Sequence, residues 1–273
     1  MPYIKTQDDT DLYVKDWGSG RPVILLHGWP LTADSWDDQA LALANAGHRV
    51  IFYDRRGFGR SSQPWTGYDY DTLADDLATV IERTGAQDAT LVGFSMGGGE
   101  VARYMSRHGG KGIAQAALIS SVVPYMLKDE SNPHGVDGSV FDGIKDGILK
   151  DRPNFMATFA QAFYGVGWIS SPVSQDVIDD FSRQALMAGL KGTLDCVDAF
   201  GRTDFRADLA AFDVPTLVLH GTSDSTVPID TAGRAAAAGI AQSQLIEYSG
   251  APHGLNVTEK DRFTTDLLAF VKG

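Results

Sequence analysis

Cysteine is almost absent from this chain, which has one, Cys196, among its 273 residues. A single cysteine excludes an internal disulfide framework and any metal site built on paired cysteines. The His-Glu-x-x-His pattern of zinc hydrolases is also missing. Long apolar runs are missing too, since no stretch of eighteen consecutive apolar residues occurs. We therefore expect no metal, no other cofactor and no membrane-spanning segment.

Basic residues are much fewer than acidic residues. The chain carries 23 Lys and Arg against 35 Asp and Glu, for a formal net charge of −12. Such a balance opposes binding to nucleic acid or to an anionic membrane surface. Residues 1–5 lack the pattern of a signal peptide, and a single cysteine fits a reducing compartment. Together these features predict a cytoplasmic protein that acts on a small molecule.

The most informative feature that is present is Gly-Phe-Ser-Met-Gly at residues 93–97. An apolar run at 89–92 reads as a buried strand, and residues 97–107 carry helix formers and end at two glycines. A serine on a sharp strand-to-helix turn has its hydroxyl exposed by strained backbone geometry, and the flanking glycines avoid clashes across the turn. The pattern therefore predicts that Ser95 is a nucleophile.

A nucleophilic serine needs a base and an acid, which in this type of fold follow it in the order serine, acid, histidine. Asp224 comes directly after an apolar strand at 214–220, on a loop at the carboxyl end of the sheet. His253 lies on the loop after the final strand and is followed by a glycine. The other five histidines lack this combination of order, loop and glycine. We predict a triad of Ser95, Asp224 and His253.

An oxyanion hole needs two backbone N–H groups. One is expected from Met96, the residue after the nucleophile, and the other from the loop after an earlier strand. Trp29 is the natural second donor, since it follows the strand 23–27 and the next residue, Pro30, has no N–H. His27, in the same loop, is interpreted as a structural hydrogen-bonding residue.

Several longer stretches resemble one family. They are 27–31 (His-Gly-Trp-Pro-Leu), 53–61 (Tyr-Asp-Arg-Arg-Gly-Phe-Gly-Arg-Ser), 63–67, 93–104 with its triple glycine, 163–165 (Phe-Tyr-Gly) and 251–254 (Ala-Pro-His-Gly). On these motifs the chain resembles α/β-hydrolases of the cofactor-free haloperoxidase, or aryl esterase and perhydrolase, group, from about residue 3 to residue 270. The nucleophile, acid, base and oxyanion donors of that family fall on the same five residues.

The expected fold is an α/β-hydrolase fold, a mostly parallel, doubly wound sheet with an inserted helical cap. Alternation of strand and helix patterns supports it. The predicted strands are 12–17, 23–27, 49–53, 89–94, 114–119, 214–220 and 244–248. The predicted core helices are 35–46, 70–84, 96–107, 231–238 and 259–272. We assign 1–121 and 209–273 to the core and 122–208 to the cap, with helices at 139–150, 152–164, 174–187 and 190–200.

The cap is expected to close over the serine. Most of its large apolar residues are read as packing between its helices: Met126, Phe141, Phe155, Phe159 and Trp168. Phe163, in the Phe-Tyr-Gly motif, is predicted to face the nucleophile and to line an apolar pocket with Trp29, Val122, Phe200 and Val227. No arginine cluster is evident for a charged substrate.

These features predict a serine hydrolase of small carboxylic (aryl) esters that works through an acyl-enzyme. The resemblance implies a second fate, in which hydrogen peroxide replaces water and forms a peracid that oxidises halide, and also implies γ-lactam opening or related amide and lactone hydrolysis as an alternative. A dehalogenase or epoxide hydrolase would need a carboxylate where Ser95 stands. A non-enzymatic binding protein on this fold stays open, as does assembly into a homo-oligomer.

Overall fold

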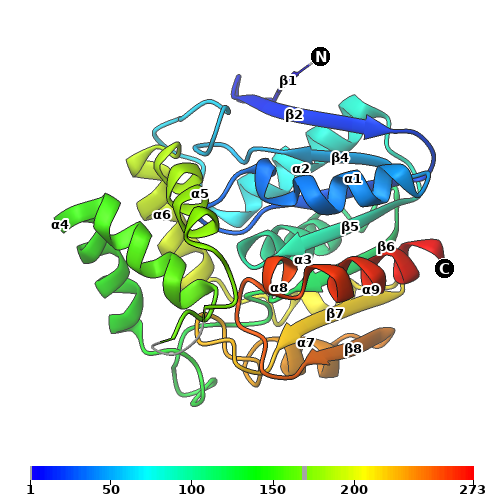
Figure 1. Ribbon diagram of the computed structural model, residues 1–273. Helices are drawn as coiled ribbons and strands as arrows, with labels where there is room; N and C mark the ends of the chain where they lie inside the picture. The colour runs from blue at the N-terminus through cyan, green and yellow to red at the C-terminus, as the bar shows by residue number, and fades with distance from the viewer. Residues whose placement is uncertain (1, 168–170) are drawn as a thin grey trace.

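The computed structural model describes residues 2–167 and 171–273; Trp168, a predicted cap residue, lies outside them. Eight strands form one sheet in the order β1-β2-β4-β3-β5-β6-β7-β8 (Figure 1). Strands β1 and β2 pair antiparallel, β2 runs antiparallel to β4, and all later neighbours are parallel. The strands are β1 Tyr3–Lys5, β2 Asp11–Gly18, β3 Pro22–Leu26, β4 Arg49–Tyr53, β5 Ala89–Phe94, β6 Ile113–Ile119, β7 Thr216–Gly221 and β8 Ser243–Tyr248. The predicted mostly parallel sheet is confirmed.

All seven predicted strands are present, and one strand was missed. The missed strand is β1, an edge strand of only three residues that pairs with β2. Three residues are too few for an alternation of apolar and polar side chains to stand out from the surrounding sequence.

Helices cover both faces of the sheet, as a doubly wound arrangement requires. Helices α1 and α9 lie on one face, whereas α2, α3 and α7 lie on the other (Figure 1). Their bounds are α1 Asp37–Asn45, α2 Tyr70–Thr84, α3 Met96–Arg107, α7 Gly233–Gly239, α8 Leu255–Thr258 and α9 Lys260–Lys272, with 3-10 helices at Ala33–Trp36 and Asp208–Ala211. Helix α7 begins two residues later than predicted.

Three further helices are inserted between β6 and β7. They are α4 Gly138–Phe163, α5 Gln175–Leu186 and α6 Leu190–Arg202, and they stand together beyond one end of the sheet (Figure 1). Helix α4 combines the two helices predicted at 139–150 and 152–164. Asp151 interrupts it with φ −161° and ψ 86°, and its carboxylate accepts a hydrogen bond from the N–H of Asn154 at 3.1 Å. Asp151 thus caps the second half of α4, which carries Pro153 in its first turn, where proline is tolerated.

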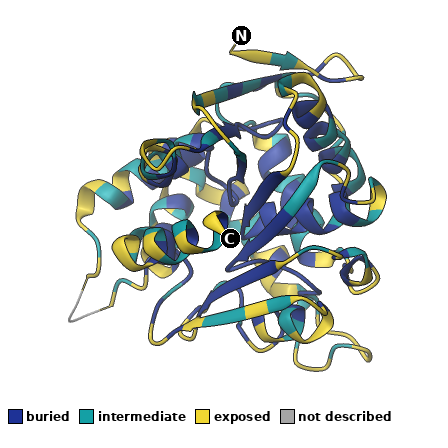
Figure 2. Ribbon diagram, turned by 90° about the vertical axis from the view of Figure 1, so that its right-hand side faces the viewer, coloured by how far each residue is buried: buried dark blue, intermediate teal, exposed yellow. Residues whose placement is uncertain are grey.

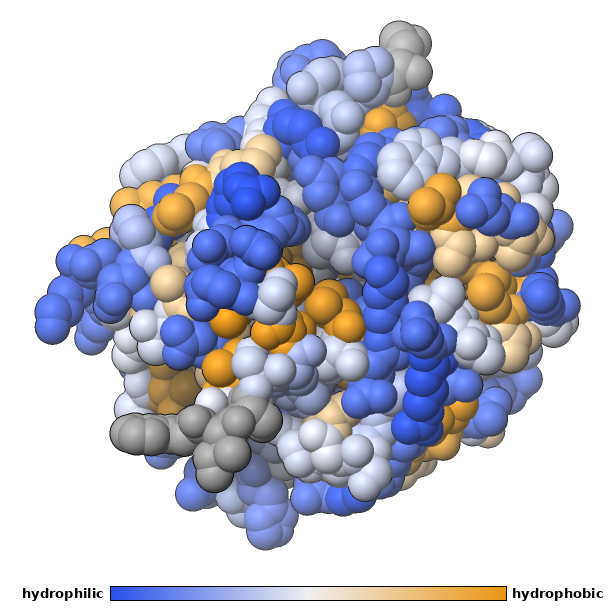
Figure 3. Space-filling view, in the orientation of Figure 1, coloured by the Kyte–Doolittle hydropathy of each residue, from blue (hydrophilic) through white to orange (hydrophobic). Residues whose placement is uncertain are grey.

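The core lies between the central strands and the helices on their two faces. Strands β3, β4, β5 and β7 are almost entirely buried (Figure 2). On the face shown in Figure 3, hydrophilic side chains predominate and hydrophobic atoms form small patches. Within the described part of the chain, no helix combines the length and the apolar character needed to cross a membrane.

Candidate active site

The turn between β5 and α3 holds Ser95 in an unusual backbone conformation. Its φ is 53° and its ψ is −117°, a left-handed geometry that costs energy for a residue with a side chain. Ser95 stands at the N-cap of α3, so the positive end of the helix dipole lies next to it. The turn predicted from the sequence is therefore present, with the serine at its tip.

Two glycines make this turn sterically feasible. A Cβ at Gly93 would lie 2.5 Å from the carbonyl oxygen of Gly97, and a Cβ at Gly97 would lie 2.5 Å from the carbonyl oxygen of Leu26. Both distances are far inside van der Waals contact with backbone, which cannot move aside. The glycines thus let β5, α3 and the end of β3 approach closely enough to build the site.

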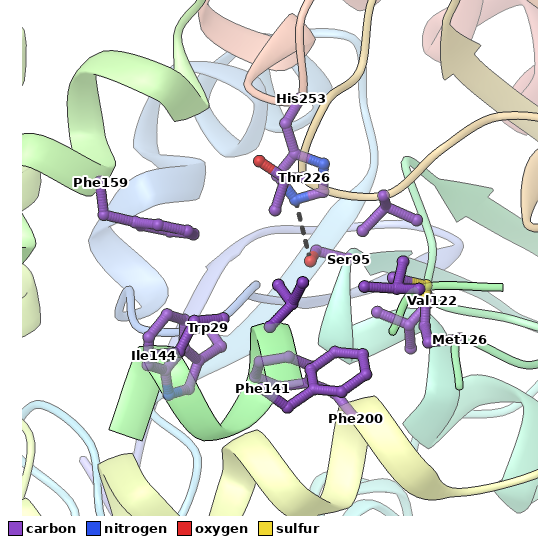
Figure 4. A pocket seen from close by; sticks show the side chains of 13 residues that line it. Trp29, Ser95, Val122, Met126, Phe141, Ile144, Phe159, Phe200, Thr226 and His253 are labelled. Atoms are coloured by element: carbon purple, nitrogen blue, oxygen red, sulfur yellow. Dashed lines mark hydrogen bonds between the residues drawn. The ribbon is translucent and has the colours of Figure 1, made fainter. Parts of the chain in front are cut away.

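The structure brings Ser95, His253 and Asp224 into one hydrogen-bonded chain. The Nε2 atom of His253 lies 3.0 Å from Ser95 Oγ (Figure 4), and its Nδ1 lies 2.7 Å from Asp224 Oδ2. An ionised carboxylate can only accept hydrogen bonds, so the imidazole hydrogen stands on Nδ1. Nε2 then has a free lone pair for the Ser95 hydroxyl proton, which is the geometry that nucleophilic catalysis by serine needs.

Asp224 is held as an anion in a buried place. Its Oδ1 accepts the backbone N–H groups of Thr226 at 2.9 Å and Val227 at 2.8 Å. Burial by itself would raise the pKa of the carboxyl. The charge interaction with His253 and hydrogen bonds from His220 and His253 outweigh burial and hold the pKa below its ordinary value. The acid is therefore ready to stabilise a charged imidazole.

The prediction that Phe163 lines the substrate pocket has to be corrected. Phe163 is 1% exposed, and its ring lies 4.8 Å from the His253 ring in an edge-to-face arrangement. Its carbonyl also accepts the N–H of Gly254 at 2.9 Å. Phe94 contacts the imidazole as well, with ring centroids 5.2 Å apart. Phe163 thus supports the catalytic imidazole, and the pocket surface that it was expected to supply comes from Phe159, one helical turn earlier.

Trp29, one predicted oxyanion donor, lines the same cavity as Ser95, and Met96, the other, directly follows Ser95. Trp29 follows β3, and Met96 is the first residue of α3. Among the described residues, neither backbone N–H has a protein acceptor. The Trp29 indole Nε1 donates to the Thr193 carbonyl of α6 at 3.0 Å, which anchors the residue to the inserted helices.

A buried ionic network supports the Trp29 loop from behind. The Arg55 guanidinium pairs with Glu100 of α3 and donates to the carbonyl of His27 at 2.6 Å. His27 Nδ1 lies 2.9 Å from the Gly28 carbonyl, and His27 Nε2 accepts the Arg55 N–H at 3.0 Å. Arg55 and His27 thus brace the loop instead of reaching the pocket, and Glu100 ties it to the nucleophile helix. Sequence reasoning gave Glu100 no role.

The cavity above Ser95 is small and apolar. Its volume is about 40 Å³. Because a single water molecule needs roughly 10–15 Å³ of such space, the cavity accommodates only a few non-hydrogen atoms. Four of the five predicted lining residues, Trp29, Val122, Phe200 and Val227, do line it. Among the described residues, the lining consists of Trp29, Ser95, Val122, Met126, Val136, Val140, Phe141, Ile144, Phe159, Phe200, Thr226, Val227 and His253. Figure 4 shows the Trp29, Phe141 and Phe200 side chains on the side of Ser95 away from His253.

The pocket residues that sequence reasoning missed come mostly from α4. Phe155, Phe159 and Phe163 repeat every four residues, which places them along one face of the second half of that helix. The repeat indicates a buried stripe but does not reveal which of the three phenylalanines faces a cavity.

No cluster of three or more His, Cys, Asp or Glu side chains within residues 2–167 and 171–273 is arranged to hold a metal ion.

Known proteins match this chain over nearly its whole length. A family model described as the alpha/beta hydrolase fold matches residues 21–260. A non-heme chloroperoxidase of Kitasatospora aureofaciens is 45% identical over 99% of both chains, and a bifunctional esterase/perhydrolase of Acinetobacter calcoaceticus is 44% identical over 100% of both. The crystal structure of a bromoperoxidase from Bacillus anthracis superposes with a TM-score of 0.96 at 45% identity, covering 99% of each chain.

Proposed function

The chain belongs to the α/β-hydrolase family, among its non-heme haloperoxidases and esterases, and we propose that it hydrolyses small neutral carboxylic esters through an acyl-enzyme on Ser95. The observation that carries the proposal is the chain of hydrogen bonds from Ser95 Oγ through His253 to Asp224. A strained serine with a free imidazole lone pair beside it has no evident structural use, whereas ester hydrolysis needs both.

The reaction follows from the placement of these groups. Ser95 Oγ attacks the ester carbonyl carbon while His253 Nε2 takes the hydroxyl proton, and Asp224 stabilises the resulting imidazolium. The carbonyl oxygen becomes an oxyanion held by the N–H groups of Trp29 and Met96. The C–O bond then breaks, and His253 returns the proton to the departing alcohol. Water repeats the sequence on the acyl-enzyme, and the carboxylic acid leaves.

The inserted helices act as a cap that selects the acyl group. We assign residues 1–121 and 209–273 to the catalytic core and residues 122–208 to this cap. The cap supplies Met126, Phe141, Ile144, Phe159 and Phe200 to the cavity. Among the residues that the structure describes, no charged side chain lines the cavity apart from the triad, and its volume of about 40 Å³ suits a short acyl chain. The preferred substrates are therefore aryl or alkyl esters of short, uncharged acids.

Phe159→Ala is expected to shift the acyl preference toward longer chains. Phe159 lines the cavity and packs edge-to-face on Trp29 with ring centroids 5.5 Å apart, so removing its ring opens space next to the acyl site. Each CH₂ group buried there contributes about 0.8 kcal/mol. We expect the ratio of kcat/KM for p-nitrophenyl hexanoate over p-nitrophenyl acetate to rise by about tenfold or more.

The matched control for this change is Phe155→Ala. Phe155 stacks on Phe159 with ring centroids 5.9 Å apart but does not line the cavity. The control should leave the ratio unchanged. An equal shift in both variants would mean that general loosening of α4, and not the width of the cavity, controls the preference.

Hydrogen peroxide is proposed as a second acyl acceptor, in keeping with the esterase/perhydrolase relative. Peroxide attacks the acyl carbon and passes a proton to His253, the bond from Ser95 Oγ to the acyl carbon breaks, and His253 returns the proton to Ser95 as the peracid leaves. The peracid then oxidises bromide to hypobromite and is itself reduced to the carboxylic acid. We expect purified protein to hydrolyse p-nitrophenyl acetate. With acetic acid as the acyl donor, Ser95 forms the same acyl-enzyme with release of water, so we expect bromination of monochlorodimedone only when acetate and peroxide are both supplied. Bromination that survives Ser95→Ala, or that is lost on adding a chelator, would contradict the acyl-enzyme route. Failure to hydrolyse any short ester would contradict the proposed function itself.

A further inference from the structure

The triad carboxylate has a second imidazole next to it. His220 stands at the end of β7, four residues before Asp224, and its side chain is fully buried. Its Nε2 lies 2.9 Å from the Val227 carbonyl oxygen and 3.2 Å from Asp224 Oδ2. Oδ2 is also the oxygen that accepts the Nδ1 hydrogen of His253 at 2.7 Å. The two imidazoles therefore meet at one carboxylate oxygen.

The surroundings of His220 decide which of its nitrogens carries the hydrogen. Both groups next to Nε2, a carbonyl and a carboxylate, can only accept, so Nε2 must be the donor. Nδ1 is buried without a hydrogen-bond partner and faces Gly233, where a Cβ would lie only 2.7 Å away. A hydrogen on Nδ1 would have no acceptor, which is costly in a buried place. His220 thus presents one N–H, shared between Val227 and Asp224.

This N–H completes the set of donors around Asp224. The carboxylate has about four lone-pair positions, and it is approached by four donors: two backbone N–H groups on Oδ1, and His253 and His220 on Oδ2. Without His220, the only hydrogen bond to Oδ2 would come from the imidazole that it has to orient. The same N–H holds the Val227 carbonyl, which joins the end of β7 to the acid loop.

We propose that His220 is a positioning residue of the triad, whose Nε2–H fixes the Asp224 carboxylate and shares its negative charge with His253. The inference rests on the proposed hydrolase function. His220 touches neither substrate nor Ser95 and transfers no proton. It acts on the reaction through the orientation of Asp224 and through the charge that Asp224 offers to His253.

The His220 donor should also affect how the reaction depends on pH. A donor on Oδ2 withdraws charge from the bond to His253, so removing it leaves more charge to stabilise protonated His253. Protonated His253 cannot act as the base, and the acidic limb of the kcat/KM profile should therefore move to higher pH when the donor is lost. Among the neighbouring elements, β8 brings Glu247 beside His220 in register, and α7 brings Arg234, whose Nη2 lies 2.7 Å from Glu247. These two groups neutralise each other at the surface and are unchanged in the variants below.

The test compares three variants on p-nitrophenyl acetate. His220→Leu removes the donor while filling most of the space, and His220→Gln places an amide N–H where Nε2 was. His48→Leu is the matched control, because His48 is also buried with an unpartnered Nδ1 but precedes β4, at the opposite end of the sheet from the site. A hydrogen bond to a charged group contributes enough to predict a loss in kcat on the order of 10- to 100-fold for His220→Leu. KM should stay within about twofold, since no substrate contact is lost.

We expect the acidic limb to move to higher pH in His220→Leu, to return toward the wild-type position in His220→Gln, and to stay unchanged in His48→Leu. A His220→Leu protein with wild-type kcat and an unmoved profile would overturn the proposal. So would a loss in kcat that His220→Gln does not restore and that leaves the profile in place, since that pattern indicates packing alone.

A measurement on the unmodified protein tests the role of His220 even if a variant does not fold. Two-dimensional ¹H–¹⁵N NMR of histidine side chains should show the Nε2–H tautomer for His220 and the Nδ1–H tautomer for His253. An Nδ1–H tautomer at His220 would overturn the proposal without any substitution. Failure of the proposed function is recognised separately, whatever the result for His220: either the wild type hydrolyses no short ester, or Ser95→Ala hydrolyses the ester as fast as the wild type.

Discussion

Ser95→Ala should lose ester hydrolysis almost completely, with a fall in kcat on the order of 10⁶, because the acyl-enzyme can no longer form. Ser95 is only 6% exposed and lies on a turn whose strain is imposed by the backbone, so the fold should persist without the hydroxyl. The measurement is the steady-state hydrolysis of p-nitrophenyl acetate, with the circular dichroism spectrum as a check of folding.

Ser121→Ala is the matched control for this prediction. Ser121 is a buried serine at the end of the neighbouring strand β6, and its hydroxyl accepts the N–H of Val123 at 3.2 Å. This variant should keep most of the activity. More than a few per cent of activity in a well-folded Ser95→Ala protein would remove Ser95 from the role of nucleophile.

Asp224→Asn is expected to reduce kcat by about 10⁴-fold while leaving the shape of the site intact. An amide NH₂ facing His253 favours the imidazole tautomer with hydrogen on Nε2, which cannot accept the Ser95 proton. Asp230→Asn provides a control on the same loop, where the side chain is exposed and pairs with Arg234. If Asp224→Asn were nearly as active as the wild type, another carboxylate would have to reach His253.

The lowered pKa of Asp224 also gives a sign for the pH dependence of stability. A carboxyl whose pKa in the folded state lies below that in the unfolded chain, about 3.9, favours folding above that pH. The contribution is lost as the pH falls through the folded-state pKa. Asn does not titrate, so the stability of Asp224→Asn should fall less steeply with decreasing pH. If the two proteins have comparable stability at pH 7, acid unfolding monitored by fluorescence should therefore begin at a lower pH in Asp224→Asn than in the wild type.

Much of the active site follows from features that are local in the sequence. Ser95 could be identified because a strand, a glycine-flanked turn and a helix lie within twenty residues, and the geometry of that turn depends on its own backbone. Asp224 and His253 could be identified because each follows a strand, and the carboxyl ends of parallel strands meet at one edge of a sheet. The mostly parallel sheet was predictable for the same reason, whereas the three-residue strand β1 had too little pattern to show.

Other features were decided only when distant segments packed together. The sequence placed Phe163 in a motif but could not tell whether its ring faces the cavity or the imidazole, since that depends on how α4 crosses the loop that carries His253. The same holds for Phe159, for the buried pair of Arg55 and Glu100, and for His220, whose contact with Asp224 requires the loop after β7 to fold back over the strand end. Chemistry that resides in a backbone turn or in strand order is encoded locally, and the sequence alone determined it. The direction of a side chain in a packed interior is set by all of its neighbours at once, and for that reason only the tertiary structure decided it.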